Sequence, residues 1–499
     1  MINNSGLLLG GVMVDKKPID GNQVRLAPQS LNRHGLIAGA TGTGKTKSLQ
    51  VMVEELSLIG VPTMVMDIKG DLSGLGAPGA TNKIIEERAH HIQMEWNATR
   101  FPIEFLSISE EPGVRLRSTV SEFGPVVLSK ILSLNETQQA LLSMLFMYCD
   151  DEGLPLLDLD DLKTVLRFSA NEGKAEFQKK YGLVPTNSAH AIMRRLTQLE
   201  QQDARVIFGE PSFDVADLCK IRDGKGVVNV LRLMDVQTRP SLFSAFMLSL
   251  LAELFEVFPE KGDVEKPELM IFIDEAHLIF KNASKELLDQ LDTIIKLIRS
   301  KGIGIVFITQ TPDDIPENIL SQLGFKIQHA LRAFTAKDRK AIKLMAQNFP
   351  DSDVYNVEDM LTELGIGEAF ISSLDRKGRP LDLVHCLMRP PLSRMDVLDA
   401  YEIKNILKES TLISKYEKTL DRESAHETLS KRIEESLAEV EEEEVKEKPT
   451  RSRRTEKSTL EKVMASSVTR TIVREITRGI LGVFGISSTT RRRRTRRRS

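Results

Sequence analysis

Eight consecutive residues near the amino terminus have the composition of a phosphate-binding loop. The segment GATGTGKT, residues 39–46, fits the pattern G-x-x-x-x-G-K-[ST]. Glycines let the backbone curl so that several N–H groups face one anion, and the start of a helix adds partial positive charge. We expect Lys45 to reach the β- and γ-phosphates of ATP and the Thr46 hydroxyl to bind Mg²⁺. The predicted nucleotide-binding residues are Gly39, Ala40, Thr41, Gly42, Thr43, Gly44, Lys45, Thr46 and Lys47.

Two acidic residues, Asp274 and Glu275, follow the apolar run LMIFI at 269–273. A phosphate loop needs an acidic partner at the end of a neighbouring strand, and this pair fits that need. We expect Asp274 to hold Mg²⁺ and Glu275 to polarise the attacking water as a general base. Acids often begin the loop after a strand, but together with residues 39–46 this pair predicts hydrolysis rather than nucleotide binding alone.

Other polar residues also follow apolar strands. Gln310, at the end of IGIVFITQ, is the candidate sensor of the γ-phosphate or the water, and an ordinary strand-ending residue is the alternative. Asp67 and Asp71 follow the strand VPTMVMD, at the edge where open α/β sheets bind ligands. Capping of the next turn is an equal alternative for these two acids.

The elements that must position these residues alternate between strands and helices. Unbroken apolar strands separated by amphipathic helices indicate a buried parallel sheet and a doubly wound α/β domain. Residues 112–225 have helical periodicity with polar faces, which predicts a mostly helical insertion. The expected helices are 44–59, 240–258 and 284–300, and the expected strands are 35–39, 61–67, 101–109, 224–233, 268–277, 302–311 and 324–333.

Composition restricts the setting in which this chain works. Its 499 residues are 41% apolar and 28% charged, as in soluble globular proteins. The three cysteines are widely spaced, which fits a reducing compartment, and the amino terminus lacks the features of a signal peptide. With no apolar run long enough to span a membrane, we expect a cytoplasmic protein.

The carboxyl-terminal part is charged and carries no sheet pattern. We expect a charged helical extension at 396–446, a linker at 447–459, and a basic amphipathic helix with an arginine-rich tail at 460–499. The last nine residues contain seven arginines. This segment could bind nucleic acid or an anionic membrane surface, and packing of its helix against the core or a neighbouring subunit is the alternative.

Five segments together resemble a known family. RHGLIAGATGTGKT, DIKGDLSGLG, FIDEAHLIF, ITQTPDDIP and QHALRAFTAKD are similar to segments of the bacterial HerA-like ATPases, which belong to the HerA/FtsK branch of RecA-like P-loop motors. The resemblance covers about residues 6–395, and REITRGILG adds to it. It implies an ATPase domain at 1–395 with a mostly parallel RecA-like sheet flanked by helices, and the helical insertion at about 112–225.

The resemblance also implies an assembly. Such proteins form rings, often hexamers, with ATP between subunits and an arginine from one subunit reaching the γ-phosphate held by its neighbour. Arg332 is the first candidate for this residue, and Arg299 and Lys301 are the second. A surface salt bridge is the alternative for each. HerA also has an amino-terminal β-barrel that helps it assemble with a nuclease, whereas about 38 residues precede the loop here, which argues against nuclease-coupled end processing.

The leading functional hypothesis is therefore an ATP-hydrolysing ring motor that binds ATP and Mg²⁺ and translocates DNA. A motor for protein substrates and a nucleotide-gated scaffold with little turnover are the alternatives. A DNA motor predicts that DNA stimulates hydrolysis, whereas a scaffold should keep its role when Glu275 is replaced by Gln.

Overall fold

One twelve-stranded sheet runs through the protein, in the order β2-β1-β14-β13-β12-β3-β11-β10-β4-β9-β5-β6. The structure is a computed structural model that describes residues 6–202, 204–235, 240–262, 264–280, 285–420 and 422–446. Residues 1–433 form one compact unit, and residues 434–499 are assigned to a second. The predicted linker at 447–459 and the predicted basic helix and tail at 460–499 lie outside the described residues.

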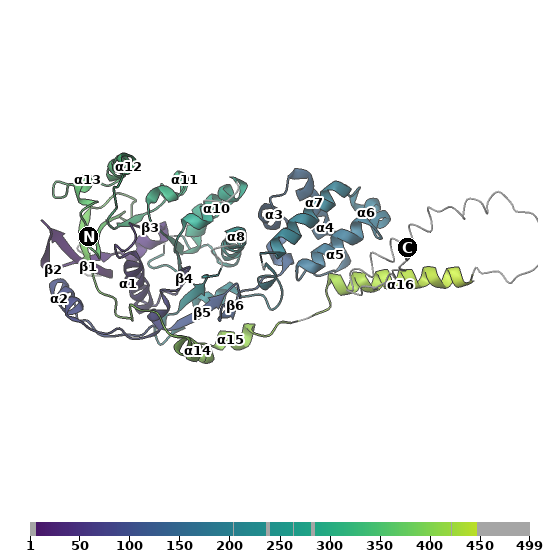
Figure 1. Ribbon diagram of the computed structural model, residues 1–499, viewed down its shortest axis with the longest axis horizontal. Helices are drawn as coiled ribbons and strands as arrows, with labels where there is room; N and C mark the ends of the chain where they lie inside the picture. Colours follow the sequence, from purple (N-terminus) through teal and green to yellow (C-terminus); the bar gives the residue numbers. More distant parts are fainter. Residues whose placement is uncertain are drawn as a thin grey trace, which may run out of the picture. The chain divides into compact units, whose positions relative to one another are not determined.

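The larger part of the sheet is parallel, which confirms the predicted α/β fold (Figure 1). Side chains alternate between its two faces: on β10, Ile271 and Ile273 belong to one core cluster and Met270 and Phe272 to the other. The parallel strands are β12 (Phe325–Gln328), β3 (Gly35–Ala38), β11 (Ile303–Thr309), β10 (Leu269–Ile273), β4 (Thr63–Asp67), β9 (Val228–Arg232), β5 (Ile103–Ser107) and β6 (Val114–Arg115).

The other end of the sheet is antiparallel, and the sequence analysis did not predict it. It joins both ends of the core sequence, because β1 pairs with β2 on one side and with β14 on the other. The segment 324–333 was expected to be the last strand of the core. Two more strands, β13 and β14, follow it in the structure. The antiparallel strands are β1 (Leu7–Val14), β2 (Lys17–Leu26), β13 (Glu368–Ser373) and β14 (Val384–Met388).

Helices cover both faces of the sheet (Figure 1). The helix after the phosphate loop packs its buried side chains Leu49, Val53 and Leu56 into one core cluster, and the helices before and after β10 contribute to the other. The helices around the parallel strands are α1 (Lys45–Leu58), α8 (Pro240–Val257), α9 (His277–Phe280), α10 (Lys285–Ile298) and α11 (Glu317–Leu320), and those beside the antiparallel end are α2 (Lys83–Ile92), α12 (Ala336–Ala346) and α13 (Val357–Met360).

Five consecutive helices lie between β6 and β9 in the sequence, and their apolar faces join the core cluster of α8 and α10. They are α3 (Val120–Ile131), α4 (Glu136–Glu152), α5 (Leu159–Ala170), α6 (Lys174–Tyr181) and α7 (Thr186–Glu200). The segment then forms a two-stranded hairpin of β7 (Ile221–Arg222) and β8 (Lys225–Gly226). The residue boundaries expected for the domains stay predictions.

Three further helices follow the last strand: α14 (Ala400–Glu409), α15 (Thr411–Tyr416) and α16 (Ala425–Lys446). The start of α16 contacts α5, since the His426 amide donates a hydrogen bond to Asp161 Oδ1 at 2.8 Å and the His426 ring lies 2.7 Å from Thr164 Oγ1. Within the part of the chain that the structure describes, no helix is long and apolar enough to cross a membrane.

Candidate functional site

The predicted phosphate loop connects β3 to α1 in the manner expected. Its backbone needs glycine, because Gly39, Gly42 and Gly44 all have positive φ, at 154°, 80° and 112°. Space adds a second requirement at Gly39, where a Cβ atom would lie 2.5 Å from Cβ of His329. The loop is therefore held in a shape that other residues at these positions would strain.

The backbone around the loop is tied to segments that come much later in the sequence. The Ala40 amide donates to the carbonyl of Ala330 at 2.8 Å, and the Gly367 amide donates to the carbonyl of Thr43 at 3.0 Å. The Thr43 hydroxyl closes the turn by donating to the carbonyl of Ala40 at 2.8 Å. The conformation of the loop thus depends on the segment after β12 and on the turn before β13.

Lys45, the first residue of α1, folds back over this loop. Its Nζ atom donates to the carbonyls of Gly39 at 2.6 Å and Ala40 at 3.1 Å, and its side chain is buried. Burial lowers the pKa of Lys45, the charge of Lys69 lowers it further, and Glu275 and Asp274 oppose the shift. An ammonium group held in a little-solvated loop favours an anion, as the phosphate-binding role requires.

A histidine that the sequence analysis missed lies beneath the loop. His329 is fully buried, and burial lowers its pKa to about 4, so the ring is neutral at pH 7. Its Nδ1 donates to the carbonyl of Glu368 at 2.8 Å, which leaves Nε2 to accept from the Ser48 hydroxyl at 2.9 Å. His329 thereby joins the first turns of α1 to β13, and no local pattern in the sequence could have indicated this contact.

Asp274 and Glu275 follow β10 directly and point to the same edge of the sheet as the loop. We expected these acids on a strand next to β3. That expectation was wrong, because β11 lies between β3 and β10. Burial, and then the nearby Glu275 charge, raise the pKa of Asp274 to about 7, while Lys69 opposes the shift. Asp274 Oδ2 is buried and has no hydrogen-bond partner within the described residues. Glu275 has the strained φ of 47°.

The loop after β4 brings a second cation to this edge. Lys69 forms an ion pair with Glu275 Oε1. Asp67 holds that loop by accepting the amides of Gly70, Asp71 and Leu72 at 2.7–3.2 Å, so of the two alternatives for Asp67 the structure supports capping. Burial raises the pKa of Asp67 to about 6, although these amides oppose the shift. The acids of this loop were predicted from sequence to lie at this edge, whereas Lys69 was not among the predicted residues.

The remaining predicted residues divide between the two edges of the parallel sheet, with Gln310 and Arg332 following the two strands that flank β3. Gln310 is exposed, just beyond the end of β11, and Arg332 is exposed in the irregular segment that follows β12. Arg299 and Lys301 precede β11, so they lie at the opposite edge of the parallel sheet from the loop. Lys301 is buried, with its Nζ 3.4 Å from Glu260 and 4.8 Å from the ring centre of Phe255, which favours the salt-bridge alternative for this residue.

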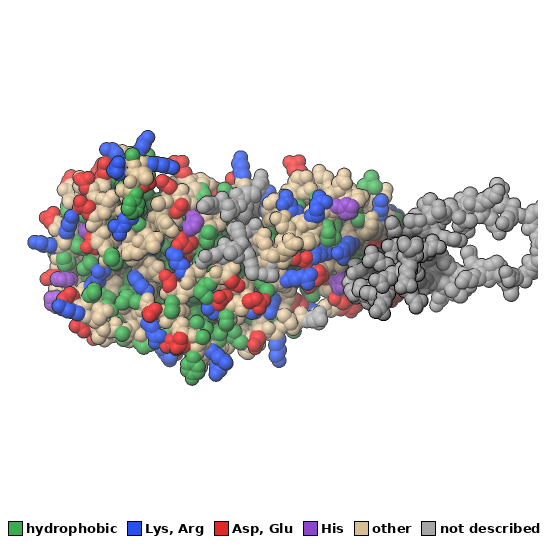
Figure 2. All heavy atoms as spheres, in the orientation of Figure 1, with side chains coloured by type: hydrophobic (Ala, Val, Ile, Leu, Met, Phe, Trp, Pro, Cys, Tyr) green, Lys and Arg blue, Asp and Glu red, His purple; other side chains and the backbone are tan. Residues whose placement is uncertain are grey.

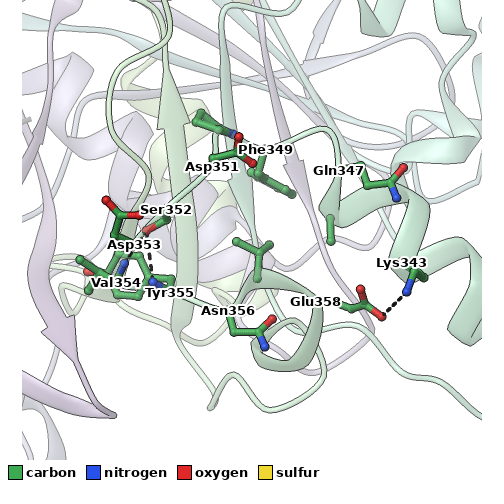
Figure 3. A pocket seen from close by; sticks show the side chains of 13 residues that line it. Lys343, Gln347, Phe349, Asp351, Ser352, Asp353, Val354, Tyr355, Asn356 and Glu358 are labelled. Atoms are coloured by element: carbon green, nitrogen blue, oxygen red, sulfur yellow. Dashed lines mark hydrogen bonds and ion pairs between the residues drawn. The ribbon is translucent and has the colours of Figure 1, made fainter.

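A pocket of about 640 Å³ lies elsewhere, between α12 and α13 (Figure 3). The residues that line it are 343, 346, 347 and 349–358, and none of the predicted site residues is among them. On one side Lys343 pairs with Glu358 at 3.4 Å, and on the other the Tyr355 hydroxyl donates to the carbonyl of Met13 at 2.9 Å. The pocket therefore belongs to the packing of this segment on β1, and the candidate site is the edge with the phosphate loop.

Comparisons with known proteins show what the chain as a whole is similar to. The family model described as helicase HerA-like C-terminal matches residues 13–492. The DNA double-strand break repair helicase HerA of Sulfolobus acidocaldarius is 23% identical over 371 residues, which are 72% of this chain and 66% of the relative. The DNA import protein CedB of the same organism is 24% identical over 74% of this chain and 54% of its own length. The chain thus spans just under two thirds of the HerA relative.

A solved structure has the same fold. The plasmid coupling protein TrwB, in complex with the non-hydrolysable ATP analogue ADPNP, superposes with a TM-score of 0.51 at 14% identity, covering 80% of this chain and 94% of TrwB. This likeness and the strand order confirm the predicted RecA-like P-loop fold.

Proposed function

Because the chain belongs to the HerA-like helicase C-terminal family, we propose that it is an ATP-hydrolysing ring motor that acts on DNA. Membership of this family confirms the predicted resemblance and supports the predicted enzyme class, a P-loop ATPase. The ring, the DNA substrate and the roles of single residues are the parts that we propose. The observation that carries the proposal is the convergence of Lys45, Asp274 and Glu275 at one edge of the sheet.

The residues at this edge fit a nucleotide with Mg²⁺. The backbone of residues 39–44 and the Lys45 ammonium would hold the phosphates, and Thr46 with Lys47 would complete the nucleotide contacts. The buried Oδ2 of Asp274, without a hydrogen-bond partner in the described residues, suits a cation or its water shell, and the Thr46 hydroxyl would be the second oxygen ligand. When bound, Mg²⁺ neutralises phosphate charge.

Hydrolysis needs a water to be oriented and deprotonated beside the phosphate. We assign the general base to Glu275, whose buried carboxylate is close enough to Lys45 and Asp274 to influence their pKa values. Gln310, at the end of the strand between β3 and β10, would contact the water or the γ-phosphate. Arg332 would act on the nucleotide of a neighbouring subunit, where a cation stabilises the charge that develops on the phosphoryl group.

A basic surface favours DNA as the substrate. The exposed cations Lys337, Arg339 and Lys340 lie on α12, close in sequence to Arg332, and Lys and Arg side chains project over this helix (Figure 2). Asp338 is committed to the cap of α12, where it accepts the amides of Phe334 and Thr335. Such a surface suits a phosphate backbone, and binding to it should weaken with salt.

The test is the rate of ATP hydrolysis with and without single- and double-stranded DNA, with the oligomer size measured in the same sample. We expect a ring oligomer whose hydrolysis rate rises several-fold with at least one form of DNA. Replacing Lys337, Arg339 and Lys340 together by Ala should remove the stimulation, while the same change at the exposed Lys174, Lys179 and Lys180 of α6 serves as the control. An assembled protein that no DNA stimulates would contradict the proposal and favour a protein substrate.

A further inference from the structure

Lys69 links the strand of Glu275 to the neighbouring strand of the sheet. β4 and β10 are adjacent and parallel, so the loop after β4 lies beside Asp274 and Glu275. The ion pair joins Lys69 Nζ to Glu275 Oε1, and the other carboxylate oxygen lies 3.3 Å from Nδ1 of His277. Oε1 of the proposed general base is therefore paired with a cation, whereas Oε2 is buried and forms no hydrogen bond within the described residues.

The backbone near Lys69 is held firmly while its side chain has room to move. The three amides bound by Asp67 order the turn that carries the lysine. The Lys69 side chain is 43% exposed, whereas that of Glu275 is 10% exposed. A long side chain on an ordered turn can reach more than one anion, because several rotamers are open to it.

The charge of Lys69 also reaches the phosphate loop. It lowers the pKa of Lys45 and opposes the rise in the pKa of Asp274. Burial lowers the pKa of Lys69 itself, but the hydrogen bond and charge of Glu275, with Asp274 and Asp71, raise it overall. The two lysines are therefore close enough to repel each other, and a polyanion bound at the phosphate loop would relieve the repulsion.

We propose that Lys69 is a positioning residue that pairs with Glu275 when no nucleotide is bound and moves to the phosphates when ATP binds. The inference rests on the proposed function, since it requires ATP at residues 39–46. It adds a coupling that the proposed function lacks: the general base is released from its cation only when the phosphate to be cleaved is present. While Lys69 is paired with Oε1, that oxygen is not free to contact the attacking water, so this exchange keeps Glu275 inactive until ATP arrives.

A double-mutant cycle on ATP binding tests the exchange without relying on hydrolysis. The four proteins are the unmodified chain, Glu275→Gln, Lys69→Met and the double variant, each titrated with Mg²⁺ and a slowly hydrolysed ATP analogue. If Lys69 must leave Glu275 to reach ATP, the Glu275→Gln change should tighten ATP binding more in the chain that has Lys69 than in the Lys69→Met variant. We expect this gain to exceed the gain in the Lys69→Met background by about fivefold, the strength of one partly exposed ion pair.

The opposite sign identifies a fixed counterion. If Lys69 stays with Glu275 in both states, the unpaired carboxylate of Lys69→Met repels ATP most, and Glu275→Gln then helps that variant more. An equal or larger gain in the Lys69→Met background would overturn the inference. Lys69→Arg, which keeps the charge, should behave as the unmodified chain, and Lys83→Met on α2 is the matched control, since Lys83 pairs with Glu87 at 3.6 Å.

Failure of the proposed function gives a different result. If the unmodified, folded chain binds no ATP analogue, both the function and the inference fall. If it binds the analogue and the cycle shows no dependence on Lys69, only the inference falls. Unfolding curves of the four proteins exclude the possibility that lost binding reflects lost structure.

Discussion

The parallel and antiparallel parts of the sheet contribute in different ways to the same site. The ends of parallel strands supply charged side chains: Lys45 after β3, Asp274 and Glu275 after β10, and Lys69 after β4. The antiparallel end supplies neutral groups, such as the Gly367 amide and the Glu368 carbonyl that His329 contacts. The parallel part therefore carries the residues proposed for catalysis, and the antiparallel part carries contacts that hold the phosphate loop in place.

The antiparallel end also carries a buried ion network. Arg389, just after β14, is fully buried and pairs with Glu54 and Glu55 of α1, each at 3.0 Å. Glu54 in addition accepts the amides of Leu392 and Ser393. The carboxyl-terminal end of α1, the helix that begins at the phosphate loop, is thus held by the segment that follows β14. Substitutions in this network should lower stability, whereas substitutions among the charged residues should lower ATP hydrolysis.

The largest effect on function is expected at Lys45. Lys45→Ala removes the cation that faces the phosphates, so we expect ATP affinity to fall by at least about a hundredfold and hydrolysis to be lost. Burying the charged Lys45 side chain costs free energy, so its removal should not destabilise the fold strongly. The melting temperature should therefore stay within a few degrees of the unmodified value. Nucleotide titration and thermal unfolding measure the two quantities, and retained hydrolysis would refute the assignment of the site.

The next largest effect is expected on stability, at Arg389. Arg389→Met leaves the buried Glu54 and the partly buried Glu55 without their cation, and we expect the free energy of unfolding to fall by about 3–5 kcal/mol. Urea denaturation measures this loss. Combining Arg389→Met with Glu54→Gln should recover part of it, because one uncompensated charge is then removed. A loss below about 1 kcal/mol would show that the network does not support α1.

The smallest effect concerns pH and His329. Its pKa is about 4 in the folded state and near 6.5 when unfolded, so the unfolded chain binds more protons between these values. The stabilisation is present above pH 6.5 and is lost as the pH falls toward 4. From pH 7 to pH 5 this group should remove about 2 kcal/mol from the free energy of unfolding.

The variant His329→Gln isolates this contribution. Acidic groups with raised pKa values, such as Asp67, act in the opposite direction, and His34 has a similarly lowered pKa of about 4. These groups are present in both proteins, so only the difference between the two pH profiles is compared. Profiles that coincide would mean that the buried ring under the loop does not titrate as described.

The parallel part could be predicted from sequence because its determinants are local. The loop, its flanking strand and helix, and the acids after β10 each lie within a few consecutive residues. The order of strands was predicted less well: β11 enters between β3 and β10, which local patterns do not specify. Lys69 was overlooked because its partner, Glu275, lies on a different strand, and only the sheet order brings the two together.

The antiparallel part could not be predicted in the same way. Ser48 and His329 are 281 residues apart, and Glu54 and Leu392 are 338 residues apart. Strands β1 and β14 pair with each other although they come from opposite ends of the core sequence. Each also pairs with its neighbour in sequence, β1 with β2 and β14 with β13, but those local pairs do not predict the contact between β1 and β14. These contacts depend on tertiary pairing between distant segments. The sequence therefore predicts the residues proposed for catalysis but not the strands that hold them in place.

Single-turnover hydrolysis by Glu275→Gln, with bound nucleotide measured in the same sample, tests the central claim most directly. The claim is that the charged edge of the parallel strands cleaves ATP. We predict that this variant binds ATP at least as tightly as the unmodified chain and hydrolyses it at least about a hundredfold more slowly. Hydrolysis at the unmodified rate, with full occupancy of the site, would contradict the account.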